Sequence, residues 1–123
     1  MSLYYRISHS SLGAVFLQHG LLASSADWVV MGPSHGLAFI LADQGYDVWL
    51  GNYRGNTYSS EHVRGRARMD GEYWHFSWDE MARYDLPTML QHMMEASGQE
   101  TFFYVAHSMG RCATPQVGVP HLR

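Results

Sequence analysis

Three short runs rich in apolar residues recur along the chain, separated by longer segments of mixed polarity. The runs cover residues 14–18 (AVFLQ), 47–50 (DVWL) and 101–106 (TFFYVA). Each has the length of a buried strand, and the third is rich in aromatic and β-branched residues. The first run stops at a His-Gly turn, and the second stops at the turn-rich stretch 51–56. We therefore predict three strands, each followed by a turn.

The segment between the first two runs predicts a helix. Leu37, Ile40 and Leu41 share one helical face, and the stretch opens after a Pro-Ser pair. Gly45 occupies the position where a C-terminal cap belongs, because glycine adopts the left-handed backbone conformation readily.

A second helix is predicted before the third run. It begins at the capping-box pattern of Ser77 and Glu80 and ends at Gly98. Pro87 lies inside it and predicts a kink or a break near Tyr84, because proline cannot donate a helical hydrogen bond. The apolar stripe of this helix comprises Leu86, Met89, Leu90, Met93 and Met94.

The order strand, helix, strand, helix, strand predicts an α/β fold with parallel strands and right-handed crossovers. In such sheets, ligands bind beyond the carboxyl ends of the strands. Two of these ends are residues 19–21 (HGL) and 107–109 (HSM). Chemistry is therefore expected at these two turns.

The composition fits one small domain with a buried core. The chain has 123 residues, of which 46% are apolar and 15% are charged. This apolar and aromatic content is higher than that of disordered chains. The net charge is −3 and the basic residues are scattered, so nucleic acid is not an expected partner.

Several other classes of protein are disfavoured. Cys112 is the single cysteine, so no disulfide can form within the chain. The longest purely apolar run, 37–42, is far too short to span a bilayer, and no transmembrane segment is expected. The first ten residues lack the apolar core of a signal peptide. The histidines show no metal-binding spacing, so neither a metal nor a cofactor is expected.

Residues 106–110 (AHSMG) differ by one residue from the G-x-S-x-G pattern of a nucleophile elbow. An elbow needs small neighbours because its serine sits on a strained turn between a strand and a helix. Ala106 in place of glycine adds one methyl group. The pattern alone also arises by chance, but here an apolar strand precedes it directly.

An ester hydrolase also needs two backbone N–H groups that bind the developing oxyanion. One comes from the residue after the nucleophile, here Met109, and the other from the loop after an earlier strand, here Leu21. The plainer interpretation of His19-Gly20 is a tight turn. The occurrence of both patterns at the ends of two predicted parallel strands favours a hydrolase.

Four blocks of sequence resemble the acid lipase family of the α/β-hydrolases, which includes gastric and lysosomal acid lipases and many insect lipases. The blocks are FLQHGLLASSADWVVMGP, LADQGYDVWLGNYRGNTYS, YWHFSWDEMARYDLP and GQETFFYVAHSMG. They cover nearly everything from Val15 to Gly110, in order and with similar spacing.

The resemblance implies a partial α/β-hydrolase fold, in which a three-stranded parallel βαβαβ unit belongs to a larger sheet. The strand ending at Gln18 would lie between the other two. Ser108 would be the nucleophile, and Leu21 and Met109 would supply the oxyanion N–H groups. The implied substrate is a lipid ester such as a triacylglycerol or a cholesteryl ester. The family is secreted or lysosomal, whereas no signal peptide is recognised here, so the compartment is left open.

The resemblance stops at Gly110. We expect residues 1–110 to form the N-terminal part of a lipase domain and residues 111–123 to form a divergent, irregular tail. Pro115 and Pro120 limit any helix after the serine to about one turn. No Asp or Glu follows Ser108, and His121 is the one later histidine. His121 lies in a proline-flanked tail and is not expected to act as the base.

Two interpretations therefore follow. The chain is a truncated lipid ester hydrolase with weak or no activity, or it is a non-catalytic lipase remnant that binds lipid or a partner protein. Its open sheet edges predict self-association. Asp85 is interpreted as structural, and we expect it to pair with Arg54, because both lie in the family blocks and neither suits an apolar core.

Overall fold

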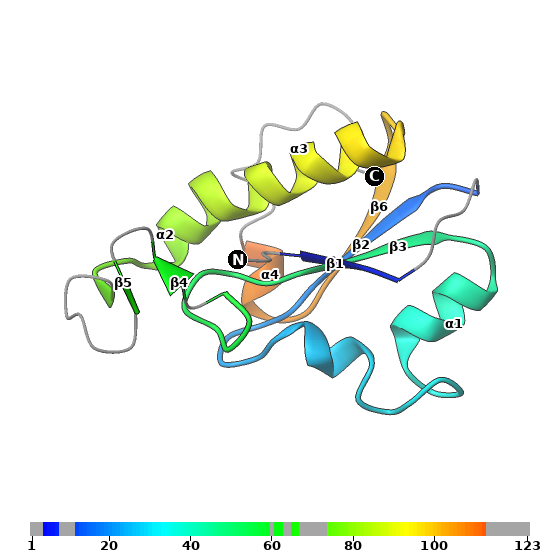
Figure 1. The fold of residues 1–123 in the computed structure, drawn as a ribbon, viewed down its shortest axis with the longest axis horizontal. Helices are drawn as coiled ribbons and strands as arrows, with labels where there is room; N and C mark the ends of the chain where they lie inside the picture. Colours follow the sequence, from blue (N-terminus) through cyan, green and yellow to red (C-terminus); the bar gives the residue numbers. More distant parts are fainter. Residues whose placement is uncertain (1–3, 8–11, 60, 63–64, 67–73, 113–123) are drawn as a thin grey trace.

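The computed structural model describes residues 4–7, 12–59, 61–62, 65–66 and 74–112. At its centre is a four-stranded mixed sheet with the strand order β1-β3-β2-β6 (Figure 1). The strands are β1 (Tyr4–Arg6), β2 (Ala14–Gln18), β3 (Asp47–Gly51) and β6 (Phe102–Ala106). A separate antiparallel pair is formed by β4 (Glu61–His62) and β5 (Gly65–Arg66).

The three predicted strands form as expected, parallel and with β2 in the middle. All five residues of β2 and of β3 are buried, which explains why these strands read as apolar runs and not as alternating patterns. Gln18, the last residue of β2, is in register with Gly51 and with Ala106. The carboxyl ends of all three strands therefore lie at one edge of the sheet.

The expectation of a three-stranded parallel unit misses β1, which pairs antiparallel with β3. Arg6 fixes this strand: its Nε and Nη2 donate to the two carboxylate oxygens of the buried Asp47 at 2.8 and 2.7 Å. Its guanidinium also lies 4.7 Å from the centre of the Trp49 ring. A three-residue strand held by one distant ion pair leaves no local pattern in the sequence.

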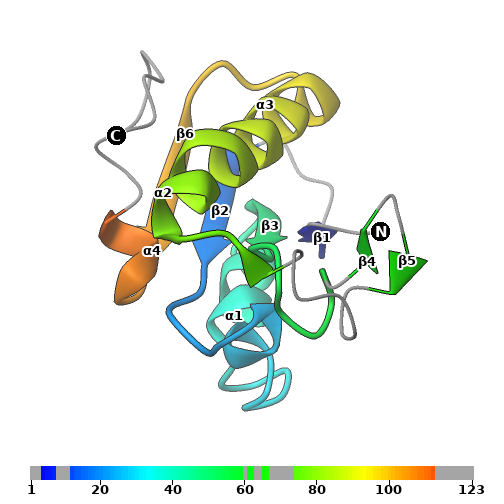
Figure 2. The ribbon, with the colours of Figure 1, turned by 90° about the vertical axis from the view of Figure 1, so that its left-hand side faces the viewer.

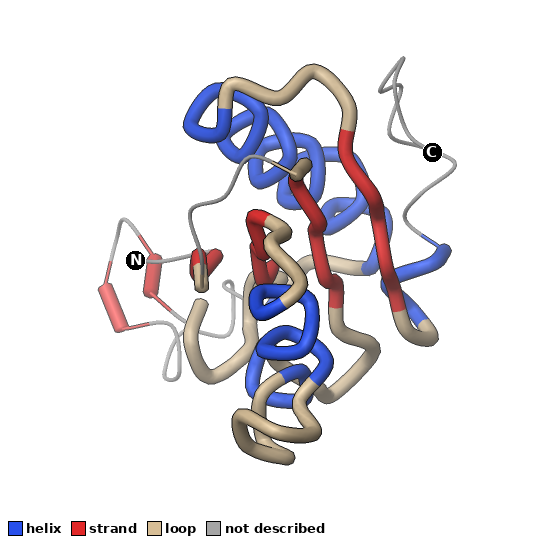
Figure 3. Tube along the Cα trace, turned by 90° about the vertical axis from the view of Figure 1, so that its right-hand side faces the viewer, coloured by secondary structure: helices blue, strands red, loops and turns tan. Residues whose placement is uncertain are grey.

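Helices cover both faces of the sheet (Figure 2). One face packs on α3 (Leu86–Ser97), which contributes Leu86, Met89, Leu90 and Met93 to a cluster with Phe16 and Trp49 of the sheet. The opposite face packs on α1 (Leu37–Asp43), whose Ala38 is fully buried against Val15, Leu17, Val48 and Leu50. Figure 3 shows the strands lying between these two helical layers.

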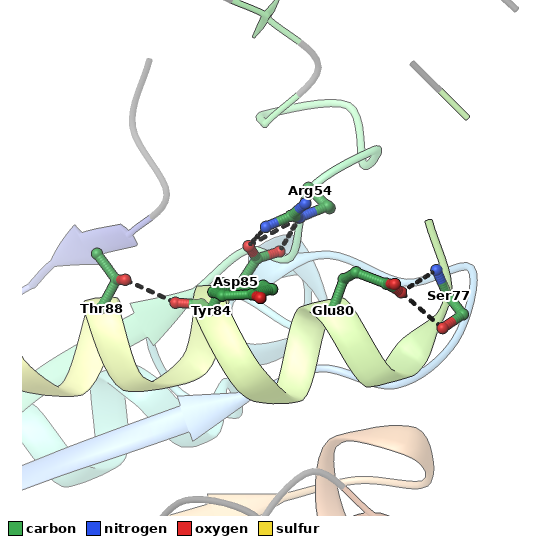
Figure 4. Close-up of polar contacts among 6 residues, drawn as sticks. All are labelled: Arg54, Ser77, Glu80, Tyr84, Asp85 and Thr88. Carbon is green, nitrogen blue, oxygen red and sulfur yellow. Dashed lines mark hydrogen bonds and ion pairs between the residues drawn. The ribbon is translucent and has the colours of Figure 1, made fainter. Parts of the chain in front are cut away.

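The second predicted helix consists of three consecutive pieces. These are α2 (Trp78–Glu80), a π-helical stretch η4 (Met81–Asp85) and α3. The π-helical stretch lies just before Pro87, which lacks the N–H that a regular helix would use there. One turn later, Thr88 Oγ1 donates to the Tyr84 carbonyl at 2.6 Å (Figure 4). The helix is thus irregular near Tyr84, but a π-helical stretch takes the place of the predicted kink or break.

The predicted helix caps are also confirmed. Ser77 donates through its backbone N–H and its Oγ to Glu80 Oε2, both at 2.6 Å. These hydrogen bonds lower the pKa of Glu80 to about 2. Gly98 ends α3 with a left-handed backbone, φ 68°. Gly45, with φ 93°, follows α1.

Among the described residues, two further short helices follow strands: η1 (Ser25–Trp28) comes after β2, and α4 (Met109–Cys112) comes after β6. No helix among the described residues has the length and apolar character needed to cross a membrane. Most of the predicted tail, including His121, lies outside the described residues, so the proposed boundary at residue 110 stays a prediction.

Candidate active site

Ser108 occupies the tight turn between β6 and α4, and its side chain is exposed. Its φ of 53° lies in the left-handed region, which is uncommon for a residue with a side chain. The Gly110 N–H donates to the His107 carbonyl at 3.1 Å and closes the turn. A strained serine between a strand and a helix is the backbone geometry of a nucleophile elbow.

Gly110 explains why the motif ends in glycine. A Cβ at this position would lie 2.9 Å from the carbonyl oxygen of His19 and 3.0 Å from that of Gln18. Both of these atoms belong to backbone, which cannot move aside cheaply. The start of α4 therefore packs directly on the end of β2, and only glycine permits the approach.

Gly20, in the turn after β2, likewise lies very close to the turn that carries Ser108. A Cβ on Gly20 would lie 3.0 Å from the Ser108 Cβ and 3.1 Å from His107 Nδ1. The loop after β2 and the turn before α4 lie at the same end of the sheet (Figure 1). The two turns singled out from the sequence therefore meet, as the parallel order of the strands predicts.

A cavity of about 370 Å³ opens beside these turns, and both Leu21 and Met109 line it. Its size falls within the range of small-molecule sites. Ser108 itself is not among the lining residues. The larger apolar side chains of the lining are Leu21, Leu22, Trp74, Phe76, Met81 and Met109, and its polar ones include His19, Arg54 and Asn56.

His19 is the buried histidine nearest the two turns, and both of its ring nitrogens are engaged. Nδ1 lies 2.8 Å from the Gly20 carbonyl oxygen. Nε2 accepts from the Tyr53 N–H at 3.2 Å and lies 3.2 Å from Asn56 Nδ2. Burial lowers the pKa of His19, so the ring is held neutral. With both nitrogens occupied, His19 does not serve Ser108 as a base.

A buried network of side chains joins the loop after β2 to the loop after β3. Asn52 Oδ1 accepts from the Ser25 N–H at 3.0 Å, and its Nδ2 donates to Ser25 Oγ at 3.0 Å. Asn56 Nδ2 donates to Asn52 Oδ1 at 2.7 Å. Sequence reasoning missed this network, because the GNYRGN stretch signals only a turn.

The predicted pair between Arg54 and Asp85 is confirmed (Figure 4). Arg54 Nη2 and Nε donate to Asp85 Oδ1 at 2.6 and 2.8 Å, and the Arg54 backbone N–H donates to Oδ2 at 3.0 Å. Asp85 is buried at the end of the π-helical stretch. The pair therefore ties the loop after β3 to this helix, and Asp85 has a structural role.

No group of three or more His, Cys, Asp or Glu side chains suited to a metal ion occurs among the described residues.

Comparison with known proteins places the chain in one family. The sequence profile of the alpha/beta hydrolase fold family matches residues 13–110. Lipase member K of Mus musculus is 51% identical over 114 residues, which cover 86% of this chain and 28% of that protein. The resemblance that the motifs predicted is thus confirmed.

Two further relatives carry names that state a substrate. Lysosomal acid lipase/cholesteryl ester hydrolase of Homo sapiens is 51% identical over 108 residues, covering 85% of this chain and 27% of that protein. Gastric triacylglycerol lipase of Rattus norvegicus is 47% identical over 114 residues, covering 86% and 29%. The chain spans little more than a quarter of the length of these relatives.

Proposed function

The chain belongs to the alpha/beta hydrolase fold family, and from this premise we propose that it carries the nucleophile and the oxyanion donors of a lipid ester hydrolase. The observation that supports this most is the meeting of the two turns. Ser108 sits on a left-handed turn, and Gly20 approaches it so closely that a Cβ there would lie 3.0 Å from the Ser108 Cβ.

The proposed reaction is acyl transfer to Ser108. Its Oγ attacks the ester carbonyl carbon, and the backbone N–H groups of Leu21 and Met109 stabilise the negative charge on the carbonyl oxygen. The bond between that carbon and the alcohol oxygen then breaks. The alcohol leaves with the proton that Ser108 loses, and the acyl group remains on Oγ. Water later releases the acyl group as a carboxylic acid.

The apolar lining of the cavity supports a lipid ester as the substrate. Leu21, Trp74 and Phe76 offer surfaces that an acyl chain would cover. The relatives are named for cholesteryl esters and triacylglycerols. We therefore propose esters of long acyl chains as substrates, in preference to short acetyl esters.

A second candidate function is a non-catalytic relative of the lipases that binds lipid or a partner protein. The observation that favours it concerns the base that Ser108 would need. His19, although close, already uses both ring nitrogens. We assign no general base, and the two candidates differ in whether Ser108 accepts an acyl group.

Self-association through the sheet edge remains a prediction. Among the described residues, β6 is an edge strand of the sheet, and its Phe103 is about half exposed. Such an edge can pair with a second copy of the chain. Light scattering across a range of protein concentrations measures this directly, and a monomer throughout would contradict it.

The function is tested with p-nitrophenyl esters of acetic acid and of a longer fatty acid. The test uses a Cys112→Ala background, because Cys112 is an exposed thiol. The sequence contains no lysine, so no lysine amine competes for the acyl group. Intact mass is expected to rise by one acyl group, more readily with the longer ester. Ser108→Ala should abolish the gain, and Ser34→Ala, a change at another exposed serine, should preserve it.

If the chain melts cooperatively but is not acylated, the proposed hydrolase function is contradicted. Retention of the same chain on triacylglycerol-containing vesicles would then support the lipid-binding candidate. Acylation that persists in Ser108→Ala would also contradict the assignment of the nucleophile.

A further inference from the structure

We propose that His19 is a positioning residue that sets the direction of the Leu21 N–H, through the hydrogen bond between its ring and the Gly20 carbonyl. This inference rests on the proposed function, in which the Leu21 N–H binds the oxyanion. It assigns His19 no contact with the substrate.

The argument begins with the peptide bond between Gly20 and Leu21. A peptide is planar and trans, so its C=O and its N–H point in opposite directions. Whatever holds the Gly20 oxygen therefore also aims the Leu21 N–H the other way. In this structure His19 Nδ1 lies 2.8 Å from that oxygen, and the Ala23 N–H donates to the same oxygen at 3.4 Å. The shorter contact is the one from the ring.

This contact requires a single protonation state of the ring. A carbonyl oxygen only accepts, so Nδ1 must carry the proton that it shares with Gly20. The Tyr53 N–H only donates, so Nε2 must offer its lone pair at 3.2 Å. The neutral ring with its proton on Nδ1 satisfies both partners. The other neutral form would set a lone pair against the Gly20 oxygen and a hydrogen against the Tyr53 N–H.

The network beyond His19 enforces the same choice. Asn56 Oδ1 accepts from the Tyr58 N–H at 3.0 Å, which fixes the orientation of the Asn56 amide. Its NH₂ group therefore faces Asn52 Oδ1 at 2.7 Å and His19 Nε2 at 3.2 Å. Two donors thus converge on Nε2, so no second proton fits there.

The Ser25 end of the network anchors the far side of the same loop. The fully buried Asn52 accepts from the Ser25 N–H through its Oδ1 and donates to Ser25 Oγ through its Nδ2. The segment from Gly20 to Ser25 is consequently held at both ends by the loop after β3. Leu21 and Leu22, which lie between the two anchors, are largely exposed and gain little support from packing. The direction of the Leu21 amide therefore depends on the hydrogen bonds of its neighbours.

Two substitutions separate this role from a general need for a buried side chain. His19→Asn places an amide N–H at the position of Nδ1, because both nitrogens are bonded to Cγ. His19→Gln places its polar atoms one bond further out, nearer to Nε2. If His19 only filled buried space, it would not matter whether the replacement carries its N–H donor at the Nδ1 position, as Asn does, or further out, as Gln does. His35→Asn, at an exposed histidine, serves as the matched control.

The first measurement is the rate at which a p-nitrophenyl alkylphosphonate labels Ser108 in the full chain. We expect His19→Asn and His35→Asn to keep most of the rate. His19→Gln should lose roughly 100-fold, the scale of a lost oxyanion donor. Melting curves of all variants identify any that fail to fold. Equal rates for folded His19→Asn and His19→Gln would overturn the inference.

The second measurement does not depend on reactivity. Nitrogen NMR of the histidine rings reports which nitrogen of His19 carries the proton. The expected spectrum has Nδ1 protonated and Nε2 bare near neutral pH. A proton on Nε2, or a cationic ring, would overturn the inference even if Ser108 is labelled. An unreactive Ser108 together with the expected spectrum would contradict the proposed function alone.

Discussion

Arg54 donates hydrogen bonds to both carboxylate oxygens of Asp85. Its Nη2 and Nε lie 2.6 and 2.8 Å from Oδ1, and its backbone N–H donates to Oδ2 at 3.0 Å. The loop that carries Asn52 and Asn56 is thereby fixed to the π-helical stretch that precedes α3. The pair lies outside the reaction itself, yet it holds one wall of the cavity in place.

Replacing Asp85 with Ala is expected to lower the free energy of unfolding by about 2 kcal/mol, because the Nε, Nη2 and backbone N–H of Arg54 all lose their buried acceptor. Urea denaturation measures the change. Asp79→Asn is the control, since Asp79 pairs with Arg83 across one turn at the surface and should cost less than about 0.5 kcal/mol. Equal costs for the two variants would show that the Arg54 pair is not special.

Replacing Gly110 with Ala tests the close packing of the elbow on β2. The added Cβ would press on two backbone carbonyls, so we expect a loss of about 2 to 3 kcal/mol. Gly98→Ala provides the comparison, because a Cβ there meets nothing within 4 Å and suffers only from the positive φ. That change should cost about 1 kcal/mol. A Gly110→Ala chain as stable as Gly98→Ala would refute the packing argument.

The motif at Ser108 could be predicted because its requirements are local. A strand of apolar residues, a serine and a glycine two positions later are contiguous in the sequence. The structure adds the reason for Gly110, which is the approach of the β2 backbone. The meeting of the two turns was likewise predictable, since parallel strands end at a common edge.

The features that escaped prediction depend on partners far apart in the chain. Asn52 and Ser25 are 27 positions apart, and asparagine in a turn gives no sign of its partner. Arg6 and Asp47 are 41 positions apart, and β1 is too short to show a pattern of its own. Pro87 indicated an irregular helix but could not distinguish a break from a π-helical stretch.

Ser108→Gly is expected to raise the free energy of unfolding by about 0.5 to 1 kcal/mol, although it removes the proposed nucleophile. Its φ of 53° costs a side-chain-bearing residue energy that glycine avoids. Ser108→Ala keeps the strain and should leave stability nearly unchanged. Thermal melts of the three chains give the comparison. A Gly variant less stable than the Ala variant would mean that the turn is not strained.

Stability should also depend on pH through His19. Burial lowers the pKa of this ring below its usual 6.5, so the unfolded chain takes up the proton first as the pH falls. Below pH 6.5 the folded state therefore loses stability, by at most about 1.4 kcal/mol per pH unit, until the folded ring is protonated as well. Urea denaturation at pH 7 and pH 5 should show a smaller drop for His19→Asn than for the unaltered chain. Identical drops would contradict a neutral His19.

The central claim is that Ser108 is a nucleophile set between two oxyanion donors, and the most direct measurement is the site of covalent modification. The Cys112→Ala chain is treated with a p-nitrophenyl alkylphosphonate, digested, and mapped by mass spectrometry. The account predicts one phosphonyl group per chain, located on Ser108 and absent from Ser108→Ala. A folded chain that carries no phosphonyl group, or carries it on another residue, would contradict the claim.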